Sequence, residues 1–378
     1  MGCLNIPELR YSSFSRFLHH KKESEGVPLD GAIEVTSHCN LTCRHCYVRD
    51  NSTKDELTLS EWKRIIDEVA EAGCLWLIFS GGEPFLRNDF LEIYTYAKRK
   101  GLIIVIFTNA TMITPQIADY LEELKPFYLE ISLYGLSRQT YKDITGSAEA
   151  YDRCMEAISF FMNRKILFRL KSVLIKENKH ELFEMKRFAK KLGVDFRFDF
   201  LINPRIDGGK DPCQTRVTPE EGVNIEMADE DVRREMTRAF LEVPGHKNSD
   251  LLFPCSAGRN SFNIDSRGNL QICNMVRYIN YDLRKGSFKK GCRLFPEILS
   301  RKKKGKSKCA TCSIDYFCNR CPGWAMMECG DEEAVVEYAC EISHLRAKYI
   351  IGKGVNGYGD KYKETLSETA DSGSKISP

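Results

Sequence analysis

Short apolar segments alternate with helical segments through the first half of this 378-residue chain, and this alternation constrains the fold more than any other feature. The apolar segments are bounded by turn residues, as β-strands are, and the segments between them repeat apolar residues at helical spacing. Strands separated by helices of this length form a parallel sheet, here about six units long. We predict an α/β fold, a partial (β/α)6 barrel of the TIM type, with an open side that admits a bulky substrate. The predicted strands are residues 32–35, 75–79, 103–107, 128–133, 168–175 and 195–200.

Local signals mark several helix boundaries. Thr58 and Glu61 have the spacing of a capping box, and apolar residues then recur at helical spacing up to Gly73. Thr114 followed by Pro115 is typical of the start of another helix. The remaining predicted helices cover residues 151–162, 181–192 and 219–241, and the last of these would close the barrel.

Changes of composition predict how the chain is organised. Residues 1–30 are mixed and polar, and we predict an N-terminal extension with a loop at residues 21–26. The barrel would occupy residues 31–245, and a small cysteine-rich domain would occupy residues 250–348. In that domain, residues 262–265 and 267–272 have the pattern of a hairpin that turns at Gly268 and leads to Cys273. The tail at residues 353–378 is rich in Gly, Ser, Lys and Asp, which predicts disorder.

Charge and hydropathy narrow the class of protein. A net charge of +3 is too small to indicate a nucleic-acid partner. No apolar run is long enough to span a bilayer, and the N-terminus lacks a basic-then-apolar signal segment. Met1-Gly2-Cys3 is compatible with lipidation, but Ile6 stands where myristoylation favours Ser or Thr. We therefore predict a cytoplasmic protein without a membrane partner. Disulfides are disfavoured in that compartment, so the 16 cysteines indicate metal ions or clusters.

Three cysteines form a tight group directly after the first predicted strand. Cys39, Cys43 and Cys46 lie on one loop at the carboxyl end of that strand, where α/β barrels place their chemistry. Thiolates favour iron–sulfur clusters or zinc, which usually take four protein ligands. His38 and His45 are the nearest candidates for a fourth ligand, and neither completes the loop. The pattern favours a cluster with one iron open to a ligand outside the protein, over a zinc loop or a chance grouping.

This Cys-x3-Cys-x2-Cys loop, with the His45 ring before its last cysteine, resembles the signature of radical S-adenosylmethionine (radical SAM) enzymes. The resemblance implies that the loop holds a 4Fe-4S cluster whose open iron chelates the amino and carboxylate groups of S-adenosylmethionine. Reductive cleavage of the sulfonium would then give a 5′-deoxyadenosyl radical, which abstracts a hydrogen from the substrate.

The segment Gly81-Gly82-Glu83-Pro84 follows the second predicted strand. Its glycines allow unusual backbone angles and close approach to a ligand, and Glu83 can accept a hydrogen bond from an ammonium group. An ordinary turn is the alternative. Its place one βα unit after the thiol loop resembles the radical SAM segment that binds the amino group of S-adenosylmethionine, which strengthens the family assignment.

Weaker matches to the family lie on later strands. Asn109 follows the third strand in a Thr-Asn-Ala step that resembles the family's Thr-Asn-Gly, and Ser132 resembles a serine near the cofactor's ribose and carboxylate. Arg169 and Lys171 alternate with apolar residues on the fifth strand, so both point one way, into the barrel, where a cation could meet the methionine carboxylate. For all four residues the alternative is ordinary polarity at strand ends. No catalytic residue is predicted.

The C-terminal region carries a second group of cysteines: Cys255, Cys273, Cys309, Cys312, Cys318, Cys321 and Cys340. Two Cys-x2-Cys pairs, at 309–312 and 318–321, could close one tetrahedral zinc site. That alternative leaves Cys255, Cys273 and Cys340 unexplained.

The order of these cysteines resembles the SPASM extension of radical SAM enzymes, which carries auxiliary 4Fe-4S clusters. The resemblance implies a distal cluster on Cys309, Cys312, Cys318 and Cys340. It also implies a proximal cluster on Cys255, Cys273 and Cys321. The spacing before Cys321 is one residue shorter than usual, and the fourth proximal ligand is open: it is Cys213, Cys292, Cys329 or no thiol. One or two auxiliary clusters are expected.

The resemblance implies an enzyme, most often one that matures a ribosomally made peptide by crosslinking, oxidation or epimerisation. It also implies an external electron donor of the flavodoxin or ferredoxin type. The short segment before the first strand leaves no room for a fused recognition domain, so a separate leader-peptide recognition protein is expected. The alternatives are a radical enzyme acting on a small molecule or on a whole protein, as sulfatase maturases do, and a non-enzymatic zinc or electron-transfer protein. Cys74 and Cys154 are interpreted as core thiols, and the basic run at residues 301–308 as a solvated loop.

Overall fold

We describe the protein from a computed structural model. The structure describes residues 11–23, 26–48, 52–242, 250–305, 307–312, 314, 317–318 and 320–352. The tail at 353–378, predicted to be disordered, and the Met1-Gly2-Cys3 sequence lie outside the described residues.

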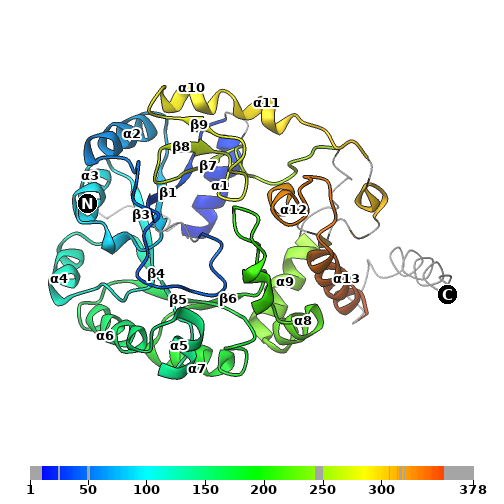
Figure 1. The fold of residues 1–378 in the computed structure, drawn as a ribbon, viewed down its shortest axis with the longest axis horizontal. Helices are drawn as coiled ribbons and strands as arrows, with labels where there is room; N and C mark the ends of the chain where they lie inside the picture. Colours follow the sequence, from blue (N-terminus) through cyan, green and yellow to red (C-terminus); the bar gives the residue numbers. More distant parts are fainter. Residues whose placement is uncertain are drawn as a thin grey trace, which may run out of the picture.

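A single curved sheet forms the centre of the molecule (Figure 1). Its strand order is β6-β5-β4-β3-β2-β1-β7-β8-β9, and the neighbours from β6 through to β7 are parallel. The six predicted strands are confirmed as β1 to β6. The strands are β1 (Asp30–Thr36), β2 (Trp76–Gly81), β3 (Ile103–Thr108), β4 (Tyr128–Ser132), β5 (Phe168–Val173), β6 (Phe196–Asp199), β7 (Ser261–Ile264), β8 (Asn269–Gln271) and β9 (Tyr281–Asp282).

Helices surround the outer face of the sheet (Figure 1). The predicted starts at Thr58 and Thr114 are confirmed: Thr58 forms a complete capping box with Glu61, and the Thr114 side chain accepts a hydrogen bond from the Ile117 N–H. The barrel helices are α2 (Leu59–Glu71), α3 (Phe90–Arg99), α4 (Pro115–Glu123), α5 (Arg138–Thr145), α6 (Glu149–Asn163), α7 (Leu182–Leu192), α8 (Pro219–Ala228) and α9 (Glu230–Glu242).

Two local predictions were wrong. Residues 219–241 form two helices, because Asp229 between them has extended backbone angles and its carboxylate accepts hydrogen bonds from the Asp231 and Val232 N–H groups. The predicted loop at residues 21–26 begins inside helix α1 (Tyr11–Glu23).

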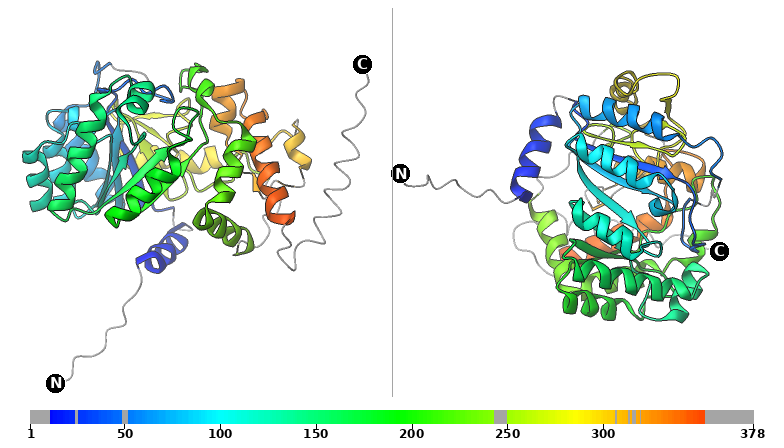
Figure 2. Two further views of the ribbon diagram at one scale, coloured as in Figure 1. Left: turned by 90° about the horizontal axis from the view of Figure 1, so that it is seen from below. Right: turned by 90° about the vertical axis from the view of Figure 1, so that its left-hand side faces the viewer.

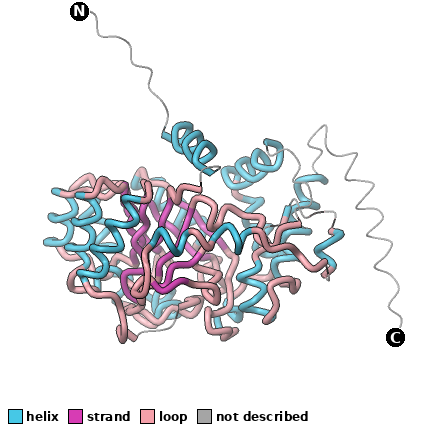
Figure 3. Tube along the Cα trace, turned by 90° about the horizontal axis from the view of Figure 1, so that it is seen from above, coloured by secondary structure: helices cyan, strands magenta, loops and turns pink. Residues whose placement is uncertain are grey.

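Helix α1 covers the end of the barrel at which the strands begin (Figures 2 and 3). Its Tyr11 ring lies 5.0 Å from the Phe127 ring, and its His19 ring stacks on Trp76 at 5.0 Å. The His19 side chain also forms an ion pair with Asp30 in the first residue of β1. These contacts leave the opposite end of the barrel for the thiol loop.

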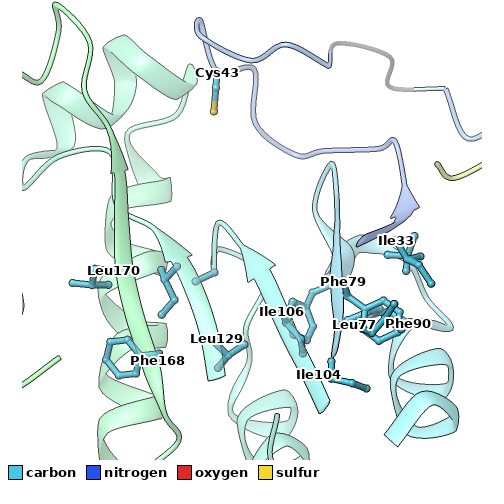
Figure 4. Close-up of a cluster of buried hydrophobic side chains, with 14 of the residues drawn as sticks. Ile33, Cys43, Leu77, Phe79, Phe90, Ile104, Ile106, Leu129, Phe168 and Leu170 are labelled. Atoms are coloured by element: carbon cyan, nitrogen blue, oxygen red, sulfur yellow. The ribbon is translucent and has the colours of Figure 1, made fainter. Parts of the chain in front are cut away.

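The hydrophobic core lies between the sheet and the outer helices. Alternate strand residues such as Ile33, Leu77, Leu129 and Leu170 are fully buried on that side (Figure 4). Residues between them face the inside of the barrel, and several of these are charged. Figure 4 also shows Cys43 on a loop beyond the carboxyl ends of the strands.

The C-terminal region continues the same sheet. Its predicted hairpin is confirmed as antiparallel β7 and β8, but β7 also pairs in parallel with β1, which the sequence did not predict. The side of the barrel next to β1 is therefore covered rather than open. The region continues with α10 (Phe288–Cys292), α11 (Phe295–Leu299), α12 (Pro322–Cys329) and α13 (Glu337–Gly352).

The barrel and the C-terminal region also share one hydrophobic core. A continuous cluster of buried apolar side chains runs from Ile33 and Leu129 in the barrel to Phe262 and Ile342 beyond it. The division into domains at residues 31–245 and 250–348 stays a prediction. In the part of the chain that the structure describes, no helix is both long and apolar enough to cross a membrane.

Candidate active site

The thiol loop is anchored to the end of helix α5 and to the segment that follows β3. Its Thr42 and Arg44 N–H groups donate to the carbonyl oxygens of Thr145 and Ile144, at 3.0 and 2.9 Å. The Asn40 side chain donates to Thr111 Oγ1 at 2.8 Å, just past the end of β3. These contacts hold the loop over the carboxyl end of the barrel.

Cys39, Cys43 and Cys46 lie close enough for their charges to interact. Burial raises the pKa of Cys43 far above its usual range, and the neighbouring Cys46 and Cys39 raise it further. Burial likewise raises the pKa of Cys39 to about 11. Thiolates crowded in this way need positive charge beside them, which the iron atoms of a cluster would supply while protons are released. The donor set therefore fits an iron–sulfur cluster. No group of three or more Cys, His, Asp or Glu side chains in the described residues is already arranged around a metal position, so the ligand assignments stay predictions.

The Gly-Gly-Glu-Pro segment packs against the thiol loop. A Cβ atom on Gly81 would lie 2.1 Å from the Thr36 carbonyl oxygen, and one on Gly82 would lie 2.1 Å from the His38 carbonyl oxygen. The Gly82 and Glu83 N–H groups donate to these same two oxygens, each at 2.8 Å. In this structure the two glycines permit backbone-to-backbone contact, and their close approach to a ligand stays a prediction. Pro84 then begins a short 3-10 turn, Pro84–Leu86.

Glu83 is fully buried beside the end of β3. Its carboxylate accepts hydrogen bonds from Thr108 Oγ1 and from the Asn109 N–H, both at 2.7 Å, and a longer one from the Phe85 N–H. Burial raises the pKa of Glu83 to about 7, although these donors lower it. A carboxylate has about four acceptor positions, so these bonds leave capacity for an ammonium group.

Asn109 connects the end of β3 to the thiol loop. Its amide nitrogen donates to Asn40 Oδ1 at 3.1 Å and lies 3.8 Å from Cys39 Sγ. The next residue, Ala110, has a positive φ of 62°, a backbone region that glycine adopts more easily. Alanine at this step is therefore more strained than glycine would be.

Ser132 is the last residue of β4, and Tyr134 follows it near the thiol loop. The Tyr134 hydroxyl is close to Cys43, and the Tyr134 ring lies 5.6 Å from the His45 ring. Ser132 is the β-ladder partner of Lys171 on β5. Ser132 and Lys171 therefore lie at the same level of the barrel wall, next to the thiol loop.

Arg169 and Lys171 alternate with buried Phe168, Leu170 and Ser172, as the sequence predicted. Arg169 donates to Glu130 Oε2 at 2.6 Å and to the Tyr128 hydroxyl at 2.7 Å. The sequence analysis missed Glu130 and its second arginine partner, Arg197 on β6. The signal for Glu130 was a carboxylate in the middle of an apolar strand.

The C-terminal cysteines form two groups in space. Cys318 interacts electrostatically with Cys309 and Cys312, and Cys340 with Cys318 and Cys309. These are the thiols that the resemblance implies for the distal cluster.

Cys273 and Cys321 interact with each other and with Cys255, the set implied for the proximal cluster. The three candidates for a fourth proximal ligand stay open. Cys292 is beside the buried Cys74, while Cys213 and Cys329 both lie beside Glu328.

The sheet and the thiol loop at its carboxyl end define the class of protein: they are the fold and site of a radical SAM domain. The sequence model of the radical SAM superfamily matches residues 33–189. The chain therefore contains a radical SAM domain at residues 33–189.

The matched relatives include heme synthases and peptide cyclases. The chain is 27% identical over 327 residues to the AdoMet-dependent heme synthase of Methanosarcina barkeri, an alignment that covers 79% of this chain and 93% of the relative. It is 29% identical over 175 residues to the PqqA peptide cyclase of Bradyrhizobium diazoefficiens, covering 46% of each protein. Several other curated relatives are likewise matched over about half of their length.

A crystal structure of Streptococcus suis SuiB bound to the precursor peptide SuiA has a similar fold, with a TM-score of 0.66. The similarity covers 90% of this chain and 84% of SuiB at 17% sequence identity. At that identity the likeness concerns the fold alone.

Proposed function

We propose that the protein reductively cleaves S-adenosylmethionine and uses the resulting 5′-deoxyadenosyl radical to abstract a hydrogen atom from a substrate. The observation that carries the proposal is the contact between the loop of Cys39, Cys43 and Cys46 and the buried Glu83 segment, through the His38 carbonyl oxygen. When bound, a 4Fe-4S cluster supplies the electron for cleavage of the sulfonium.

The chain's own residues have separate roles in this proposal. The three thiolates bind the cluster. Gly81, Gly82 and Pro84 hold the Glu83 segment against the thiol loop, and Glu83 accepts a hydrogen bond from the ammonium of S-adenosylmethionine. Asn109 and Ser132 remain proposed contacts of the cofactor. Arg169 and Lys171, for which the sequence predicted the same role, are proposed here for the barrel wall next to the cofactor.

The C-terminal thiols would hold one or two auxiliary clusters of the SPASM type. The thiols form two groups, which supports two clusters. One group is Cys309, Cys312, Cys318 and Cys340, and the other is Cys255, Cys273 and Cys321. Such clusters would accept an electron from the substrate radical or contact the substrate.

The first candidate substrate is a ribosomally made peptide, which the similarity to a PqqA peptide cyclase supports. This proposal includes an electron donor of the flavodoxin or ferredoxin type and a separate protein that recognises the leader peptide. A cytoplasmic location is proposed with it, because reduced thiols and clusters persist there.

The second candidate is a small molecule of the iron-tetrapyrrole class. It is favoured by the heme synthase relative, which the chain matches over 93% of that protein's length.

Anaerobic reconstitution with iron and sulfide, followed by reduction, tests the proposed function. We expect mass spectrometry to detect 5′-deoxyadenosine from S-adenosylmethionine. A candidate precursor peptide or Fe-coproporphyrin III, added separately, should increase its formation if it is the substrate. Bound zinc without sulfide, and no 5′-deoxyadenosine under any condition, would contradict the proposal.

A further inference from the structure

A group of basic side chains lies inside the barrel around a single buried carboxylate. Glu130 on β4 is 2% exposed, and it forms ion pairs with Arg169 on β5 at 2.6 Å and with Arg197 on β6. Lys171 on β5 lies 3.7 Å from the same carboxylate. We call Arg169, Lys171, Arg197 and Glu130 the basic cluster.

The β-ladder explains how these residues meet. Glu130 is the partner of Arg169, and Lys171 is the partner of Arg197, so the cluster crosses three adjacent strands on one face. Lys171 is also level with Ser132, two residues before the Tyr134 ring that lies beside the thiol loop. The basic cluster therefore lines the barrel wall below the predicted cofactor site.

The basic cluster carries more positive than negative charge. On the opposite side of the barrel, Arg277 and Glu34 form a one-to-one ion pair, in which the guanidinium donates to both carboxylate oxygens. Arg216 with Glu328 and Arg346 with Glu226 are also one-to-one pairs.

In the basic cluster, three cations share Glu130. Asp199 on β6 adds a second negative charge near Lys171, but its side chain is exposed and caps the Leu201 N–H. The excess of cations is therefore not neutralised by the buried groups of the barrel wall.

Uncompensated cations in a partly buried site favour binding of an anion. Burial lowers the pKa of Lys171 and the nearby Arg197 lowers it further, while Glu130 and Asp199 offset this in part. The side chains of Arg169, Lys171 and Arg197 are still 30%, 32% and 47% exposed, so a ligand inside the barrel can reach them. A guanidinium beside an ammonium is well suited to a carboxylate.

We propose that Lys171 and Arg197 bind a carboxylate group of the substrate inside the barrel, where it competes with Glu130 for their positive charge. The proposal rests on the proposed function, because it assumes that the substrate enters the barrel below the radical site. The carboxylate can belong to an acidic peptide side chain or to a tetrapyrrole side chain. Both sources are tested separately below.

The experiment measures binding to the full-length, reconstituted protein. The probes are metal-free coproporphyrin III, which is fluorescent and carries carboxylates, and a fluorescein-labelled oligoglutamate peptide. The variants are Lys171→Gln and Arg197→Gln, with Arg138→Gln as the matched control, since Arg138 is 70% exposed on outer helix α5. The affinity for S-adenosylmethionine is measured on each variant.

We expect at least one probe to bind, with a dissociation constant about tenfold higher in Lys171→Gln and in Arg197→Gln and unchanged in Arg138→Gln. The probe that shows the loss identifies the source of the carboxylate. Glu130→Gln, which removes the competing anion and keeps the cations, should bind the same probe more tightly. A purely structural role for the basic cluster would weaken binding in all three cluster variants.

Three results would overturn the proposal: neither probe binds the unmodified protein, the cluster variants bind as well as the control, or the affinity for S-adenosylmethionine falls along with probe binding. The last result would assign the cations to the cofactor. Formation of 5′-deoxyadenosine by the unmodified protein is measured independently, so failure of the basic cluster is distinguishable from failure of the proposed function.

Discussion

Cys43 is the most deeply buried of the three thiols on the N-terminal loop. Replacing it in Cys43→Ser should remove one cluster ligand, because a hydroxyl at this buried position does not ionise as a thiol does. We expect the reconstituted variant to lose about four iron atoms per chain and to form 5′-deoxyadenosine only at background level. Iron analysis and mass spectrometry measure the two effects.

Cys154 supplies the control for that experiment, since its thiol is also buried but lies on α6, where it contacts Tyr141 in the core. Cys154→Ala should keep the iron content and the cleavage of S-adenosylmethionine. If Cys43→Ser retains both as well, the N-terminal loop is not the cluster site.

Glu83 gives a prediction for pH dependence in the protein without cofactor. Its pKa is raised from 4.5 to about 7 because burial disfavours the charged carboxylate. The folded state therefore binds more protons than the unfolded state between these values, and stability falls as pH rises through that window. Relative to Glu83→Gln, the free energy of unfolding should fall by about 3 kcal/mol between pH 4.5 and 7.5. Denaturant unfolding of both proteins across this range gives the difference, and parallel curves would show that Glu83 does not titrate there.

The thiol loop and Glu83 were predictable from sequence because each motif is contiguous and follows a strand directly. Their contacts were not, because the carbonyl oxygens that require Gly81 and Gly82 belong to a different strand end. Glu130 and Arg197 were missed for the same reason: their pairing depends on the register of three strands, which no local pattern specifies.

At the scale of elements, the contact between β1 and β7 deserves a direct test. The Phe262 ring of β7 lies over Gly31 of β1, where an added Cβ would be 2.2 Å from the ring. Gly31→Ala should therefore reduce the free energy of unfolding by about 1–3 kcal/mol, since overpacking displaces the ring. Thermal and denaturant unfolding measure the loss.

A double-mutant cycle separates this contact from a general effect on β1. Phe262→Ala removes the ring and is itself destabilising, but it leaves room for the added methyl group. The combined variant should lose less stability than the sum of the two single variants. Additive losses would show that Gly31 is required for another reason.

Elements with local signals were predicted well. Strands β1 to β6 and the starts of α2 and α4 follow from alternation and capping residues. The division between α8 and α9 depends on one aspartate within a helical pattern, and the pairing of β7 with β1 depends on a contact more than two hundred residues apart in sequence. Neither feature changes the local spacing of apolar residues, so the sequence pattern did not indicate it.

In the whole molecule, the C-terminal region is joined to the barrel by more than the shared sheet. Helix α13 contacts α8, and the Tyr338 hydroxyl donates to the carbonyl oxygens of Phe200 and Val217, at 3.2 and 3.1 Å. The Arg346–Glu226 pair crosses the same boundary at 2.6 Å. Any auxiliary cluster would thus be held rigidly against the barrel, where its position relative to the radical site can be fixed.

This arrangement predicts that the distal thiols and the N-terminal thiols can be separated in function. Cys312→Ser should remove the distal cluster, about four of about twelve iron atoms per chain, while the cluster on Cys43 and its neighbours remains. Reduced protein should still form 5′-deoxyadenosine, because the distal thiols are not part of the predicted site for the sulfonium. Conversion of substrate should fall at least tenfold if the distal cluster carries electrons away from the substrate radical. Cys74→Ala, which changes a buried thiol interpreted as part of the core, is the matched control and should retain all the iron. If Cys312→Ser also keeps its full iron content, the distal group is not a cluster site; if it loses iron but converts substrate normally, that cluster only stabilises the fold.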